Sequence, residues 1–215
     1  MNRTDNRAPE PVVLVPGLWL GGWSMGLIGR WMHDAGFATH PFSYPTVHNT
    51  LRESAHALRA FSDSVAGPAV HFVGHSLGGI VIRAMLAWYP PARPGRVVTL
   101  GSPHGGCHAA TLFGASDWGR RMLGQGISDL LHGERLPCDF DGREIGIVKG
   151  DLSFGFGRLL FTLPQPNDGV ISAEEADLPG AADSVTLPVA HSGMLCSYDV
   201  VRQACAFLRR GRFDR

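Results

Sequence analysis

One short stretch, Gly74-His75-Ser76-Leu77-Gly78, carries a residue type and a spacing that could do chemistry. An apolar run precedes it, and an apolar stretch at helical spacing follows it. An abrupt turn from strand to helix strains the backbone and brings the flanking residues together, so Gly74 and Gly78 suit such a turn. The serine hydroxyl would then project above the carboxyl edge of a sheet, where open α/β sheets place their sites. We predict that Ser76 is a nucleophile; the alternative is that it only caps the following helix.

A nucleophilic serine needs a base, because its hydroxyl is unreactive near neutral pH, and the base needs an orienting carboxylate. The chain has ten histidines, of which only His191 lies after residue 132. His191 directly follows the last expected strand, where a loop at the carboxyl edge should begin. This position agrees with the order serine, acid, histidine that is typical of this class of site. We therefore predict that His191 is the base.

Two aspartates could orient that histidine. Asp151 directly follows the strand expected at residues 144–150, which is the simplest position for an orienting carboxylate. Asp168 lies further on, in the Pro- and Asn-rich loop LPQPNDGVIS. Spacing alone does not separate the two candidates.

The elements that must position these residues alternate between strand and helix along the chain. The apolar patterns predict strands near residues 11–17, 37–45, 69–73, 95–101, 144–150 and 183–189. They predict helices near residues 23–35, 51–65, 77–89 and 198–210. This alternation is typical of an α/β fold with a mostly parallel sheet of about six strands flanked by helices.

The length of 215 residues fits one domain, residues 1–215. Between Cys107 and Gly142 the strand–helix alternation breaks. Apolar residues keep helical spacing there, but three glycines weaken the helix. Residues 107–142 are therefore either an ordinary covering helix or a movable cap over a site.

Composition argues against several classes of protein. The formal net charge is zero, so neither a nucleic-acid footprint nor a polybasic membrane anchor is indicated. The polar N-terminus and the lack of an 18-residue apolar run predict a cytoplasmic protein without stable membrane insertion. The four scattered cysteines predict reduced thiols, and the stretch HGGCH at residues 104–108 matches no common zinc spacing, so no metal is expected.

Five motifs occur in an order that resembles bacterial lipases and related esterases of the α/β-hydrolase superfamily: LVPGLW, GHSLGG, LGSPHGG, PNDGVIS and HSGML. The resemblance extends from about residue 11 to residue 210. It implies the α/β-hydrolase fold, with Asp168 as the acid of a Ser-His-Asp triad and Asp151 as the fallback. The residue after the nucleophile, Leu77, should offer one backbone N–H to an oxyanion, and the resemblance places the second donor at Leu18. Family members commonly have His-Gly where this chain has Pro-Gly before Leu18, which leaves the anchoring of that loop open.

The resemblance implies hydrolysis of carboxylic esters through an acyl-enzyme, without a cofactor. The substrate would be a small-molecule or lipid ester. Because the chain shows no export signal and only a short candidate lid, short or medium acyl chains fit better than interfacial lipase activity. An acyltransferase or thioesterase with the same triad is the second possibility, and a non-catalytic binding protein of this fold is the third.

Overall fold

Six strands form one parallel sheet in the computed structural model, which describes residues 8–131, 136–137, 140–154 and 163–215. The strand order is β2-β1-β3-β4-β5-β6, and each pair of neighbours is parallel. The predicted α/β architecture with a parallel sheet of six strands is therefore confirmed. The strands are β1 (Glu10–Val15), β2 (Phe37–Pro41), β3 (His71–His75), β4 (Val97–Leu100), β5 (Ile145–Gly150) and β6 (Asp183–Leu187).

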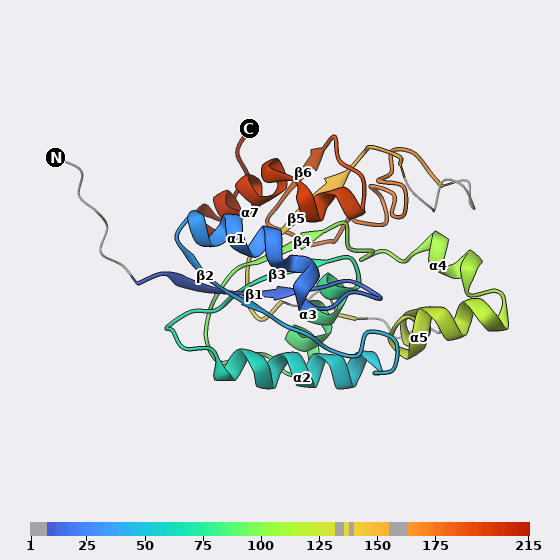
Figure 1. Ribbon diagram of the computed structural model, residues 1–215, viewed down its shortest axis with the longest axis horizontal. Helices are drawn as coiled ribbons and strands as arrows, with labels where there is room; N and C mark the ends of the chain where they lie inside the picture. The colour runs from blue at the N-terminus through green and yellow to red at the C-terminus, as the bar shows by residue number, and fades with distance from the viewer. Residues whose placement is uncertain (1–7, 132–135, 138–139, 155–162) are drawn as a thin grey trace.

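Helices cover both faces of the sheet: α1 and α7 lie on one face, and α2 and α3 lie on the other (Figure 1). The alternation of side chains along β1 shows why both faces need cover. Val13 and Val15 pack under α2 and α3, whereas Val12 and Leu14 pack under α1 and α7. The helical elements are η1 (Gly22–Met25), α1 (Gly26–Asp34), α2 (Leu51–Ser64), α3 (Leu77–Trp88), α4 (His108–Phe113), α5 (Asp117–Leu131), η2 (Ser192–Cys196) and α7 (Tyr198–Arg210).

Local signals set the ends of the covering helices. A capping box begins α2, since the Thr50 hydroxyl accepts from the Glu53 N–H and the Glu53 carboxylate accepts from the Thr50 N–H. The Ser197 hydroxyl caps α7, which ends at Gly211 in the left-handed conformation with a φ of 70°. Within the described part of the chain, every helix falls short of the length or apolar character that a membrane span needs.

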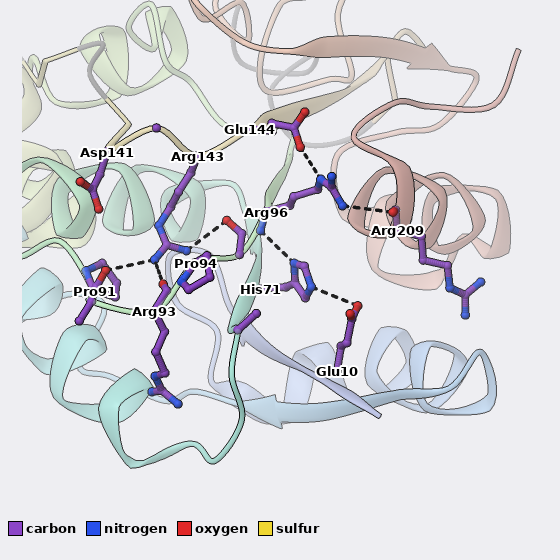
Figure 2. Close-up of a pocket in the computed structure, with 14 residues that line it drawn as sticks. Glu10, His71, Pro91, Arg93, Pro94, Arg96, Asp141, Arg143, Glu144 and Arg209 are labelled. Carbon is purple, nitrogen blue, oxygen red and sulfur yellow. Dashed lines mark hydrogen bonds and ion pairs between the residues drawn. The ribbon is translucent and has the colours of Figure 1, made fainter. Parts of the chain in front are cut away.

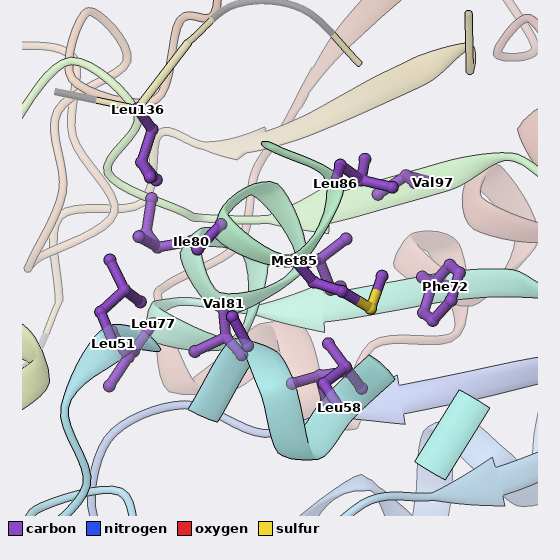
Figure 3. Packing of buried hydrophobic residues seen from close by; sticks show 14 of the residues in the cluster. Leu51, Leu58, Phe72, Leu77, Ile80, Val81, Met85, Leu86, Val97 and Leu136 are labelled. Carbon is purple, nitrogen blue, oxygen red and sulfur yellow. The ribbon is translucent and has the colours of Figure 1, made fainter. Parts of the chain in front are cut away.

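The helix that follows Ser76 is buried on all sides. Residues 77–86 of α3 are all buried, and their apolar side chains pack in the cluster that α2 and the sheet share; Figure 3 shows Val81 and Met85 in this cluster. A helix enclosed in this way cannot shift without opening the core on both sides. The N-terminus of α3, and with it the serine, is therefore fixed by the largest apolar cluster.

Two helices, α4 and α5, lie beyond the carboxyl ends of the strands, within the segment 107–142 (Figure 1). The helical spacing expected there agrees with α5, but the helix kinks at Gly124, which has a φ of 76°. A Cβ at Gly124 would lie 2.2 Å from the Val47 carbonyl oxygen, and the Gln125 N–H donates to the same oxygen at 3.0 Å. The glycines were expected to weaken this helix. In the structure, one of them, Gly124, forms a kink where α5 contacts Val47. Motion of this segment stays a prediction.

A cavity of about 590 Å³ lies at the opposite, amino edge of the sheet (Figure 2). Arg143 extends into its wall and is 9% exposed. The Arg143 guanidinium donates to the carbonyl oxygens of Pro91, Arg93 and Gly95, so it ties the loop before β4 to the segment just before β5. These bonds make this arginine a structural link, far along the strands from Ser76.

Candidate active site

Ser76 occupies a strained turn between the last residue of β3 and the first residue of α3. Its φ of 54° and ψ of −122° lie outside the regions that a non-glycine residue ordinarily adopts, at a cost of about 1–3 kcal/mol. The Ser76 N–H donates to the Leu100 carbonyl at 2.9 Å, which fastens the turn to β4. Ser76 is at the N-cap position of α3, but its side chain makes no capping hydrogen bond with that helix, so the structure does not support a capping role for the hydroxyl.

The glycines around the serine are required by close contacts between backbones. A Cβ at Gly78 would lie 2.2 Å from the Val15 carbonyl oxygen, and one at Gly74 would lie 2.6 Å from the Gly79 nitrogen. A Cβ at Gly79 would lie 2.1 Å from the Ser102 hydroxyl. Side chains at positions 74 and 78 were expected to collide in the turn, and this geometry agrees with that expectation. Gly79 is needed for another reason, because it lies against Ser102 in the loop after β4.

His191 and Asp168 form a buried pair at the carboxyl edge of the sheet. The His191 Nδ1 lies 2.7 Å from the Asp168 Oδ2, and the two residues are 8% and 1% exposed. The other carboxylate oxygen, Oδ1, accepts from the N–H groups of Val170 at 2.9 Å and Ile171 at 2.7 Å. The His191 N–H also donates to the Asp168 carbonyl at 2.8 Å. In the neutral form of the ring, a carboxylate that accepts at Nδ1 places the proton on that nitrogen and leaves the lone pair on Nε2.

The second candidate acid, Asp151, lies elsewhere. Its side chain is exposed, and its backbone N–H donates to the Leu187 carbonyl at 3.2 Å. Among the described residues it makes no hydrogen bond with His191. The geometry therefore favours Asp168 over Asp151 as the partner of the histidine.

His75 links the serine turn to the histidine loop, a contact that the sequence did not indicate. Its Nε2 donates to the His191 carbonyl at 3.1 Å, and the two rings lie 4.9 Å apart. Burial lowers the pKa of His75 to about 3, with a smaller contribution in the same direction from the nearby His191. His75 is therefore neutral and adds no charge beside His191. No hydrogen bond joins the hydroxyl of Ser76 to the Nε2 of His191 in this structure.

The loop after β1 crosses directly over the serine turn. A Cβ at Gly17 would lie 3.0 Å from the Cβ of Ser76, so the loop that continues into Leu18 lies beside Ser76. In the described part of the chain, the N–H groups of Leu18 and Leu77 have no hydrogen-bond partner. Two free donors close to the serine are what a developing oxyanion would need.

Trp19 anchors this loop and was also missed by the sequence. The Leu20 N–H donates to the Gly17 carbonyl at 3.2 Å, which closes a β-turn. Because Trp19 and not Leu18 carries a positive φ, 62°, the turn is of type II, which favours Gly or Asn at that position. The left-handed conformation costs a tryptophan about 1–2 kcal/mol, and single hydrogen bonds contribute about 0.5–1.5 kcal/mol.

Two such bonds offset the strain. The Trp19 N–H donates to the Thr46 hydroxyl at 3.0 Å, and the indole Nε1 donates to the Met122 carbonyl in α5 at 2.7 Å. The Tyr44 hydroxyl also donates to the Pro16 carbonyl at 3.1 Å. These three bonds anchor the loop. They do so although Pro-Gly stands before Leu18, where similar sequences commonly have His-Gly.

Nothing in the described residues resembles a metal site: no group of three His, Cys, Asp or Glu side chains could surround an ion there. The cysteines Cys107, Cys196 and Cys205 are free thiols, and Cys138 lies outside the described residues. Burial raises the pKa of Cys107 to about 12, so this thiol stays protonated and is a poor nucleophile.

Comparison with known proteins identifies the fold. No family model and no curated protein matches this chain. The mature form of a Bacillus licheniformis lipase is similar over 95% of this chain and 92% of its own, with 20% identity and a TM-score of 0.76. A metagenomic carboxyl esterase is similar over 86% of this chain and 65% of its own, with 20% identity and a TM-score of 0.67. An α/β-hydrolase fold protein from Nakamurella multipartita covers 95% and 93%, with 15% identity and a TM-score of 0.63. The chain therefore has the α/β-hydrolase fold.

Proposed function

We propose that this protein is a serine hydrolase that cleaves carboxylic esters through Ser76, His191 and Asp168. The observation that carries the proposal is the buried His191–Asp168 pair at the same sheet edge as a strained serine; among the described residues, the second ring nitrogen of His191 makes no hydrogen bond. A carboxylate whose other oxygen already accepts two backbone N–H groups can fix the tautomer of the imidazole and stabilise its protonated form.

The reaction follows from these positions. The Ser76 oxygen attacks the ester carbonyl carbon while its proton passes to the His191 Nε2. The N–H groups of Leu18 and Leu77 donate to the oxyanion of the tetrahedral intermediate. As the intermediate collapses, the ester C–O bond breaks and the His191 proton passes to the leaving alcohol. Water then attacks the acyl-enzyme by the same steps in reverse order, releasing the acid and the free serine.

The named activities of the similar structures support this proposal. A lipase and a carboxyl esterase are among those structures, and their identity to this chain is 20%. The same fold hosts many reactions, so the reaction type has to rest on the site. The side-chain set of this site is that of acyl transfer to serine.

The direct test is hydrolysis of p-nitrophenyl esters with acyl chains of two to sixteen carbons. Replacing Ser76 by Ala should lower kcat by at least about a thousandfold, because the nucleophile is lost. The matched control is Ser184→Ala, on the exposed side of β6, which should keep wild-type activity. The chain-length profile of the wild type would report the acyl pocket.

Other results would change the assignment. A stoichiometric burst of p-nitrophenol without turnover would indicate an acyltransferase that lacks its acceptor. If the wild type neither turned over an ester nor reacted with a fluorophosphonate at Ser76, the hydrolase proposal would be wrong.

A further inference from the structure

We infer that Trp19 is a positioning residue, which fixes the oxyanion donor at Leu18 by tying the loop after β1 to α5. The inference rests on the proposed function and adds a role for a residue that does not take part in bond making. It also gives α5, which lies beyond the carboxyl ends of the strands, a function in the site, since the carbonyl of Met122 becomes part of the support of Leu18.

The first step of the argument is the turn that contains Leu18. This residue is at the second position of the type II turn, and Trp19, with its positive φ, is at the third. The relaxed alternative, a type I turn, rotates the peptide between these two residues and turns the Trp19 N–H away from Thr46. The bond from that N–H to the Thr46 hydroxyl, 3.0 Å, therefore selects the strained form. The Leu18 N–H belongs to the preceding peptide, so this bond acts on the donor by fixing where the whole turn lies.

The second step is that three segments are bonded to one another in a closed circuit: the turn at Trp19, residues 46–47 and α5. Trp19 donates to Thr46 through its backbone and to Met122 through its indole. The neighbour of Thr46, Val47, accepts the Gln125 N–H of α5 at 3.0 Å and packs against the Gly124 backbone. Each segment of the circuit thus contacts both others. A displacement of α5 is transmitted to the turn through the indole.

The third step is that packing does not explain the tryptophan. Trp19 is 55% exposed and belongs to neither of the two apolar core clusters. Trp23, only four residues away, is 79% exposed and makes no hydrogen bond through its indole in the described part of the chain. A Trp→Phe change at either position leaves the backbone N–H in place, but only at Trp19 does it remove an indole bond to α5, so Trp23 provides a control for the loss of the indole.

The experiment compares Trp19→Phe with Trp23→Phe on one p-nitrophenyl ester. The first change keeps an aromatic ring and removes the indole donor. We expect Trp19→Phe to lower kcat about tenfold with KM unchanged, because a displaced donor weakens binding of the transition state alone. The inhibition constant of a trifluoromethyl ketone, which forms an oxyanionic adduct with the serine, should rise by a similar factor. Trp23→Phe should change neither quantity.

The second anchor gives an independent test if Trp19→Phe fails to fold. Thr46→Val removes the acceptor of the Trp19 N–H while keeping the side-chain volume, and should also lower kcat without changing KM. Thr46→Ser restores the hydroxyl and should recover most of that loss. A merely structural role would lower the melting temperature without this rescue of kcat.

Three results would overturn the inference in an active wild type. Trp19→Phe could match Trp23→Phe, which would show that the indole bond does not matter. It could raise KM with kcat unchanged, which would make Trp19 a substrate contact. The kcat could fall without any change in ketone inhibition, which would place the effect away from the oxyanion. A wild type without Ser76-dependent turnover would instead contradict the proposed function itself.

Discussion

Two histidine–carboxylate pairs stand at opposite edges of the same sheet. At the carboxyl edge, His191 Nδ1 lies 2.7 Å from Asp168; at the amino edge, His71 Nε2 lies 3.3 Å from Glu10 (Figure 2). Both imidazoles are buried, yet the Glu10 side chain is 50% exposed, whereas the Asp168 side chain is 1% exposed. The residue types are similar, so the pairs differ in what surrounds them.

The two pairs differ in how many nitrogens of the histidine ring lack a partner among the described residues. His71 accepts the Arg96 N–H at Nδ1, 2.9 Å, and directs Nε2 to Glu10, so both nitrogens are used within the protein. His191 uses only Nδ1 and makes no hydrogen bond through Nε2 within the described residues. A histidine beside a carboxylate is thus a structural link in one place and a candidate base in the other. An unused nitrogen near a strained serine distinguishes the candidate base.

The largest expected effect comes from exchanging each carboxylate for its amide. Asp168→Asn should lower kcat by about 10³–10⁴-fold, because an amide no longer selects the productive tautomer of His191. Glu10→Gln should leave kcat unchanged. Steady-state ester hydrolysis by both variants measures the difference.

Asp151→Asn supplies the control for the acid. It should keep wild-type activity, since Asp151 is exposed and does not contact His191. Loss of activity in this variant together with an active Asp168→Asn would reverse the assignment.

A smaller effect is expected from adding a methyl group at two close backbone contacts. A Cβ at Gly78 would lie 2.2 Å from the Val15 carbonyl, and a Cβ at Gly95, at the amino edge, would lie 1.9 Å from the Val70 carbonyl. Alanine at either position should lower the free energy of unfolding by about 1–3 kcal/mol, measured in urea. Only Gly78→Ala should also lower kcat per folded molecule, because the Ser76 turn moves with it. Equal activity in the two variants would mean that the turn tolerates displacement.

The smallest effect concerns acid stability. Burial lowers the pKa of His75 to about 3, while the unfolded chain keeps about 6.5. Between these values the unfolded state binds more protons, so stability is complete above the unfolded value and is lost as the pH falls. From pH 7 to pH 6, wild type should lose about 0.7 kcal/mol more than His75→Gln, whose side chain does not titrate. Urea unfolding at both pH values measures this difference.

His71→Gln tests the same pH dependence of stability at the amino edge of the sheet. Burial lowers the pKa of His71, but the carboxylate of Glu10 acts in the opposite direction. The difference from wild type should therefore be smaller than for His75→Gln. A larger difference would show that Glu10, half exposed to solvent, does little to offset the burial of His71.

The sequence alone determined the architecture and indicated two members of the candidate site, because their signals are local. Apolar periodicity and turn residues indicated the six strands and the main helices, and those elements are present. The glycine spacing around Ser76 reflects contacts within one turn, and Gly74 and Gly78 meet the predicted crowding. His191 was indicated by its place after the last strand. Each of these inferences needs only neighbours in the chain or the order of the elements.

Only the tertiary structure decided the contacts between distant segments. Asp151 and Asp168 both follow β5, and the loop path, rather than the spacing, brings Asp168 to His191. The bond from the Trp19 indole to Met122 joins residues 103 positions apart, and His75 meets His191 across 116 positions. No periodicity encodes such pairs, because they depend on how whole elements pack. The sequence therefore indicates which residues could react, and packing determines which partners they have.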